Sequence, residues 1–138
     1  MANRLYNAYC QRLLHGQSNW LDGNRYCFLL TSAYVFDENH VSLSDIPLAA
    51  RIAYVVIPSR EIGPKGWACS LPILFPALTG PAVASFVFTS GTSESSNLGA
   101  YFDDAIELPF QPNGSDFYLL PSSRDGGGAT GSGGWFRP

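Results

Sequence analysis

The side chains that could perform nucleophilic or acid–base catalysis are few in this chain of 138 residues. It contains two histidines, His15 and His40, and a Ser–His or Cys–His pair would have to use one of them. Neither histidine lies in a known nucleophile motif. His15 falls at the expected end of a helix, where capping or an interaction with the helix dipole accounts for it. We therefore expect no catalytic residue and no enzymatic activity.

Patterns that would bind a metal ion or a cofactor are equally weak. His40 follows Asp37 and Glu38, which suggests a weak metal site, but a solvated polar loop accounts for the same residues. Asp103 and Asp104 are neighbours on an expected strand, so their side chains point to opposite faces and cannot act on one substrate together. A glycine-rich stretch near the C-terminus lacks the Gly-Lys-Ser/Thr ending of a phosphate-binding loop. We expect neither a metal nor a cofactor.

The three cysteines do not form a recognisable framework either. Cys10, Cys27 and Cys69 are too few and too widely spaced for a disulfide scaffold or a Cys-x-x-Cys metal site. Their sequence neighbours are mostly apolar. We expect buried free thiols.

Composition indicates a protein that covers part of its surface with another protein. Hydrophobic residues make up 46% of the chain, but charged residues make up 14%, against about 25% in ordinary globular proteins. Because charged side chains are the usual coating of a soluble monomer, their shortage favours burial of surface in a subunit contact. A monomer coated by serine and glycine is the alternative. We expect a homo-oligomer or a larger assembly.

Charge and hydropathy also limit the classes of partner. The net charge is −3, and the eight basic residues are scattered without a cluster, so a nucleic acid partner is not expected. No apolar run approaches the roughly eighteen residues of a membrane span, and the N-terminus lacks the apolar core of a signal peptide. We expect a protein that is made and assembled in a cytoplasm, without a membrane partner.

Hydrophobic periodicity predicts one helix at the N-terminus. Leu5, Tyr9 and Leu13 recur every four residues, and Asn3 can cap the helix that they define. We place this helix within residues 1–16, where a glycine ends the periodic pattern.

The remaining body, residues 24–121, is expected to be rich in β-strands. Expected strands lie at 26–31, 51–57, 83–89, 98–102 and 116–120. The turn residues between the third and fourth strands predict a hairpin, and 106–110 could extend its second arm. A spacing of about ten residues between strands suggests an antiparallel sandwich or barrel.

Two stretches of the body interrupt this pattern. Residues 32–47 form an expected long polar loop. The proline-rich stretch 61–78 is expected to be irregular or to lie at a sheet edge, because each proline removes a hydrogen-bond donor.

Residues 122–138 form an expected glycine-rich C-terminal arm that ends in Trp135, Phe136 and Arg137. Burial of the two aromatic rings would offset the entropy of ordering so many glycines. We expect the rings to anchor a terminal strand or arm, either on the protein's own sheet or on a neighbouring subunit. The fold is thus predicted as one mainly β domain, residues 1–138.

Several segments, taken in order, resemble a family of small structural proteins of tailed bacteriophages. The chain opens with Met-Ala-Asn-x-Leu-Tyr and closes with an aromatic–Arg pair. The segments between are Ser44-Asp45-Ile46-Pro47, Ala50-Arg51, Phe86-Val87-Phe88, Leu98-Gly99-Ala100-Tyr101-Phe102-Asp103, Leu108-Pro109-Phe110 and Pro112-Asn113-Gly114. Members of this family have a more charged middle, where this chain has its proline-rich stretch.

The resemblance implies a non-enzymatic protein of the virion. Our expectation is a head decoration, or cement, protein that reinforces the lattice of the major capsid protein, its expected partner. A neck, tail or baseplate protein is the alternative. Residues predicted to contact partners are Leu5, Tyr6, Arg51, Trp135, Phe136 and Arg137, with the two arginines facing acidic capsid loops.

A module that binds glycans or a receptor is a third, less favoured class. Trp20, Trp67 and Trp135 could form aromatic platforms on a β-sandwich. Packing of the three rings in the core or in a subunit interface is the favoured interpretation.

Overall fold

The computed structural model describes residues 4–21, 23–63, 66–103, 107–121 and 133–136. In chain order, the elements are β1 (Arg4–Leu5), α1 (Asn7–Leu14), β2 (Tyr26–Leu30), the 3₁₀-helices η1 (Leu43–Asp45) and η2 (Leu48–Ala50), β3 (Arg51–Val56), β4 (Glu61–Ile62), β5 (Ala68–Ser70), β6 (Ile73–Phe75), β7 (Ser85–Thr89), β8 (Leu98–Phe102), β9 (Phe117–Leu119) and β10 (Gly133–Phe136).

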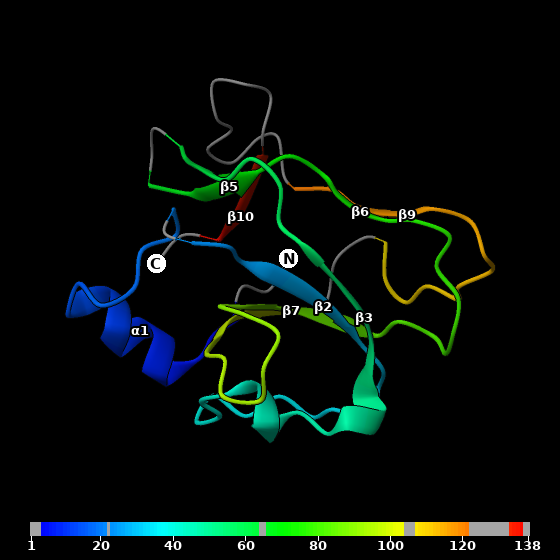
Figure 1. The fold of residues 1–138 in the computed structure, drawn as a ribbon, viewed down its shortest axis with the longest axis horizontal. Helices are drawn as coiled ribbons and strands as arrows, with labels where there is room; N and C mark the ends of the chain where they lie inside the picture. Colours follow the sequence, from blue (N-terminus) through cyan, green and yellow to red (C-terminus); the bar gives the residue numbers. More distant parts are fainter. Residues whose placement is uncertain (1–3, 22, 64–65, 104–106, 122–132, 137–138) are drawn as a thin grey trace.

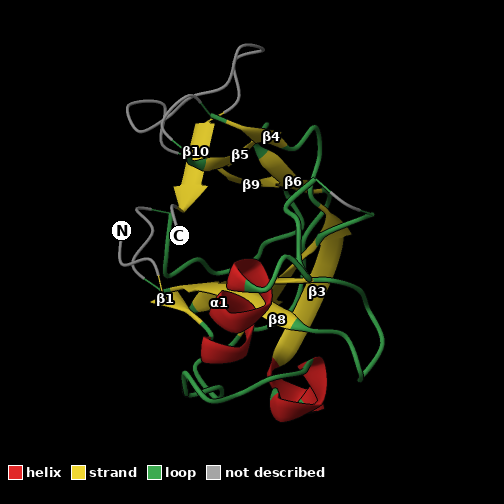
Figure 2. Ribbon diagram, turned by 90° about the vertical axis from the view of Figure 1, so that its left-hand side faces the viewer, coloured by secondary structure: helices red, strands yellow, loops and turns green. Residues whose placement is uncertain are grey.

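The strands form three antiparallel sheets, which confirms the expected mainly β fold. The large sheet has the order β1-β8-β7-β2-β3, and two smaller sheets have the orders β10-β5-β4 and β6-β9. Figure 2 shows the smaller sheets lying over one face of the large sheet, with α1 beside it. The described strands form no closed barrel, so the layered alternative of the two expected architectures is the one observed.

Strand β2 confirms the strand predicted from the uninterrupted apolar run at 26–31. It pairs with β3 on one side and β7 on the other, so both edges are hydrogen-bonded. Its residues Cys27 to Leu30 are all buried, which means that both faces of the strand are covered. A strand enclosed in this way has no polar face to show in its sequence.

The predicted hairpin is confirmed as β7 and β8, which pair antiparallel. Figure 1 shows β7 beside β2, its other partner in the large sheet. The expected extension of the hairpin's second arm is reduced to a single bridge in the described part of the chain. Phe110 forms an isolated bridge with Val83, and the peptide bond before Pro109 is cis. A proline in this position cannot donate to a strand ladder, which accounts for the short pairing.

The proline-rich stretch is more regular than expected, because it contains β4, β5 and β6. Strand β5 is the central strand of its sheet, so the expectation of irregular or edge structure is wrong there. Strand β6 occupies the three residues between Pro72 and Pro76 and, among the described strands, pairs only with β9. The prolines therefore limit the length of these strands rather than prevent them.

The N-terminal helix is present but begins later than predicted. Leu5 belongs to β1, which pairs with β8, and α1 starts at Asn7. Asn3, the expected cap, lies outside the described residues. The glycine that was predicted to end the helix, Gly16, does follow its last turn. Gly16 has a φ of 70°, and its N–H donates to the carbonyl of Leu13 at 3.2 Å.

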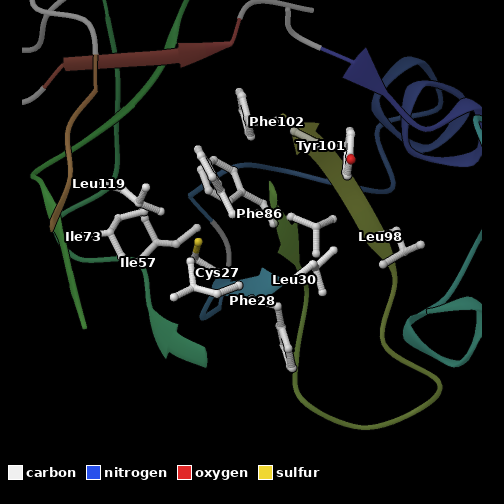
Figure 3. Close-up of a cluster of buried hydrophobic side chains, with 14 of the residues drawn as sticks. Cys27, Phe28, Leu30, Ile57, Ile73, Phe86, Leu98, Tyr101, Phe102 and Leu119 are labelled. Carbon is white, nitrogen blue, oxygen red and sulfur yellow. The ribbon is translucent and has the colours of Figure 1, made fainter. Parts of the chain in front are cut away.

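The interior lies between the large sheet and the smaller ones. Phe86, Phe88 and Phe102 of the large sheet face Trp135 of β10, with ring centroids 5.4 to 6.0 Å apart. Figure 3 shows part of this cluster, in which Ile73 and Leu119 of the β6–β9 sheet approach Cys27 and Phe86. Burial of these aromatic side chains stabilises the folded state, as the high aromatic content of the sequence leads us to expect.

Candidate functional site

Three predicted contact residues are buried inside their own chain. Tyr6, Trp135 and Phe136 are almost inaccessible to solvent. Trp135 donates its indole N–H to the hydroxyl of Ser70 at 2.7 Å, and β10 pairs with β5. Of the two arrangements considered for the C-terminal rings, this is packing on the protein's own sheet. A contact of these rings with a partner stays a prediction, and Arg137 lies outside the described residues.

The guanidinium group of Arg51 is bound to acceptors of its own chain. Its guanidinium forms an ion pair with Glu94 at 2.6 Å and donates to the carbonyl oxygens of Leu43 and Ile46, each at 2.7 Å. Its side chain is 10% exposed, and its hydrogen bond lowers the pKa of Glu94. Arg51 therefore ties the loop around η1 to the β7–β8 turn. The remaining predicted contact residue, Leu5, is half-buried in β1.

The histidines and aspartates take structural positions. His15 is the exposed C-cap of α1. Asp103 forms an ion pair with Arg4 at 3.3 Å, and Asp104 lies outside the described residues. In the part of the chain that the structure describes, no group of three His, Cys, Asp or Glu side chains is placed to hold a metal ion.

His40 belongs to a short network of hydrogen bonds rather than to a group of carboxylates. Its Nδ1 lies 2.8 Å from the hydroxyl of Tyr34, which lies 2.8 Å from the hydroxyl of Tyr6. Burial raises the pKa of Tyr6 and of Tyr34, so both phenols stay protonated at neutral pH. The network holds the loop of residues 31–47 against the start of α1.

The tryptophans and cysteines mostly follow the expectation of packing. Trp20 and Trp135 are buried, whereas Trp67 is partly exposed. Cys27 and Cys69 are buried thiols, and burial raises the pKa of both. Cys10 is a free thiol of intermediate exposure.

The outer face of the large sheet carries exposed apolar side chains at β3. Successive residues of a strand point to opposite faces, so Tyr54 and Val56 point away from the interior that Val55 faces. Tyr54 stacks on Phe28 at 5.0 Å and still leaves 53% of its surface exposed. We call Tyr54, Val56 and their half-buried neighbour Tyr26 the β3 patch.

The outer face of the two-stranded sheet carries a second apolar group. Ile73 and Leu119 point inward, so Leu74 and Tyr118, which are register partners, point outward. Tyr118 is 50% exposed, and the following Leu120 is similarly exposed. We call Leu74, Tyr118 and Leu120 the β6–β9 patch. Figure 2 shows the β6–β9 sheet lying over the large sheet. Because the two sheets pack through their inner sides, the outward residues of the two patches point away from each other.

Sequence reasoning missed both patches. The strands that carry them are apolar at almost every position, as in Ile73-Leu74-Phe75 and Phe117-Tyr118-Leu119. Without alternation of apolar and polar residues, the outward positions cannot be recognised. The shortage of charged residues was the available signal, and it predicted such surfaces without their positions.

Comparisons with protein-family models, curated proteins and solved structures find no match to this chain. Among the described residues, no helix combines the length and the apolar character needed to cross a membrane.

Proposed function

We propose that this protein is a non-enzymatic structural subunit of a tailed-bacteriophage particle, and that it acts as a head decoration protein on the major capsid protein lattice. The proposal rests on the resemblance of its ordered sequence segments to small phage structural proteins and on the surface described above. It assigns the β3 and β6–β9 patches, rather than Arg51, to contacts with neighbouring subunits.

The observation that carries the proposal is the exposure of apolar rings on two opposite outer faces. Single exposed apolar residues are common on monomers, but groups of them on ordered strands are typical of interaction surfaces. Tyrosine suits such a position because its ring buries a large area while its hydroxyl remains hydrogen-bonded to water. Two opposite faces allow one molecule to contact two neighbours at once.

Such contacts would hold the subunit on the lattice because several of them form at once. An interface of about 800 Å² per partner is of ordinary strength by itself. When one subunit bridges several neighbours in a lattice, each further contact becomes intramolecular, and dissociation slows greatly. A decoration protein of this kind would reinforce a capsid without any chemistry at a catalytic site.

The copy number of the chain in phage particles tests this proposal. It can be measured by quantitative mass spectrometry of purified particles, with the major capsid protein as the internal reference. Hundreds of copies support head decoration. About six to twelve copies would instead indicate a ring in the neck, tail or baseplate. A particle without the chain would contradict a structural role, and a receptor- or glycan-binding module would then be the alternative.

A further inference from the structure

Outside the β3 and β6–β9 patches, a pocket lies between α1, the β7–β8 hairpin and the part of the chain that carries Gln17, Trp20 and Arg25. Its empty volume is about 480 Å³, part of it open to solvent. One wall is apolar, from Phe88, Phe136 and Leu98, and the rest is polar. The polar lining comes from Tyr9, Arg12, Gln17, Ser18, Arg25, Thr89, Ser90 and Asn97.

Two arginines give this pocket its character. Arg12, in the last turn of α1, donates to the carbonyl of Leu98 at 3.2 Å, and Arg25 donates to the carbonyl of Asn19 at 2.8 Å. A guanidinium has five N–H groups, so most donors of each side chain remain available. Neither arginine forms an ion pair with any residue in the described part of the chain.

The two guanidinium groups influence each other and the same phenol. The pKa of Arg12 is lowered by burial and, to a smaller extent, by the charge of Arg25. The pKa of Tyr9 is raised by burial, and both arginines act against that shift. Two like charges held near one hydroxyl in a partly enclosed space repel each other. An anion in the pocket would relieve that repulsion.

We propose that this pocket binds a carboxylate group, held by the guanidinium groups of Arg12 and Arg25 and by the hydroxyl of Tyr9, with the body of the ligand against the apolar wall. Arginine matches the planar carboxylate through paired N–H donors, and hydrogen bonds between charged groups are the strongest of their kind. The inference uses no residue of the β3 or β6–β9 patch, and it does not depend on the particle function.

A carboxylate fits this pocket better than a phosphate does. Arg12 lies at the C-terminal end of α1, where the helix dipole places partial negative charge. Phosphate sites usually employ the opposite end of a helix, whose free N–H groups favour a second negative charge. The apolar wall of Phe88 and Phe136 also favours a ligand with an organic body over a bare anion.

Titrations of the isotope-labelled protein, followed by NMR chemical shifts, test the proposal. The probes are glucuronate, as an acidic sugar, and the blocked amino acid N-acetyl-aspartate amide, as an acidic side chain of a protein. Their uncharged counterparts, glucose and N-acetyl-asparagine amide, serve as matched controls, and inorganic phosphate tests the choice of anion. Saturable shifts at Arg12, Arg25 and Tyr9 with an acidic probe, but not with its counterpart, support the proposal, and the tighter acid identifies the source of the carboxylate.

Variants locate the binding. Arg12→Gln and Arg25→Gln should each weaken binding at least about tenfold, the effect of losing one hydrogen bond between charged groups. Arg4→Gln makes the same change of charge outside the pocket and should leave the affinity within about twofold. Arg12→Lys keeps the charge but not the paired donors, so it should weaken binding in a protein with an unchanged spectrum. Absence of saturable binding by both acids, tighter binding of phosphate, or equal weakening by Arg4→Gln would each overturn the assignment.

Discussion

The outer face of the large sheet is covered by other parts of the chain at its β8 end and left exposed at its β3 end. At β8, Tyr101 is 5% exposed, because Phe36 stacks on it at 4.9 Å and Tyr34 packs against it at 5.8 Å. At β3, across the same face, Tyr54 remains 53% exposed although it stacks on Phe28. The loop of residues 31–47 supplies the cover at the β8 end. The chain therefore shields its own aromatic side chains over one half of this face, whereas the β3 half stays exposed and is the half that we propose to contact a partner.

The largest loss of stability is expected from a substitution on the inner face of the sheets, where the side chains are fully buried. Trp135→Ala should lower the free energy of unfolding by about 3 to 5 kcal/mol, because it leaves a cavity among three phenylalanine rings and removes the partner of Ser70. Urea denaturation followed by circular dichroism measures this. Trp135→Phe, which keeps most of the ring contacts, should cost clearly less. A loss below about 1 kcal/mol for Trp135→Ala would mean that β10 adds little to the fold.

The covered end of the outer face depends on the Tyr6–Tyr34–His40 network. Tyr34→Phe removes one hydroxyl and leaves the hydroxyl of Tyr6 without its buried partner, so stability should fall by about 1 to 3 kcal/mol. Tyr118→Phe removes the same atom from a half-exposed ring and should change stability little. Equal effects of the two variants in thermal denaturation would show that the loop does not depend on this network.

The loop should also respond to acid through Asp45. Backbone N–H groups of Val41 and Ser42 donate to its carboxylate and lower its pKa. A lowered pKa stabilises the folded state above the usual aspartate value, and this contribution is lost as the pH falls through the lowered pKa. Asp45→Asn should therefore cost up to about 1 kcal/mol at neutral pH, because the two N–H groups lose a charged acceptor but the side chain is exposed to water.

The pH dependence of the Asp45→Asn difference separates this effect from a change in packing. In urea denaturation, the gap between the two proteins should begin to narrow as the pH falls below about 4 and should close as the pH falls through the lowered pKa of Asp45, because both side chains are uncharged only below that pKa. A gap that stays constant over that range would contradict the role assigned to the carboxylate.

A small effect on stability is expected at the uncovered positions. The double variant Tyr54→Thr, Tyr118→Thr should cost about 1 kcal/mol or less, because it removes the stack of Tyr54 on Phe28 but both rings are half-exposed and threonine suits a strand. Its retention on particles should nevertheless fall strongly, as judged by co-sedimentation with capsids. Unchanged retention would separate the patches from assembly.

Much of the fold could be predicted because local signals agreed with the tertiary structure. The apolar run of β2, the hairpin β7–β8 and the glycine that ends α1 all behaved as their sequences indicate. The start of α1 was wrong because Leu5 satisfies helical spacing but pairs with Ala100 in the sheet. Strand pairing depends on a distant segment, which periodicity within one segment cannot reveal.

The candidate sites were harder to predict than the fold. The sequence singled out Arg51, yet its donors are consumed by Glu94 and by carbonyl oxygens of the chain itself. Arg12 and Arg25, which keep available donors, carry no distinguishing neighbours in the sequence. Whether an arginine is free for a partner depends on which acceptors the fold brings to it, and that is a property of tertiary structure.

Solvent labelling of tyrosines in the assembled particle tests directly whether the β3 and β6–β9 patches contact neighbouring subunits. Hydroxyl-radical labelling followed by mass spectrometry can compare Tyr54 and Tyr118 with the covered Tyr101, in the free protein and on the particle. We expect strong labelling of Tyr54 and Tyr118 in the free protein, loss of that labelling on the particle, and low labelling of Tyr101 in both. Labelling of Tyr54 and Tyr118 that is as strong on the particle as in the free protein would contradict this expectation.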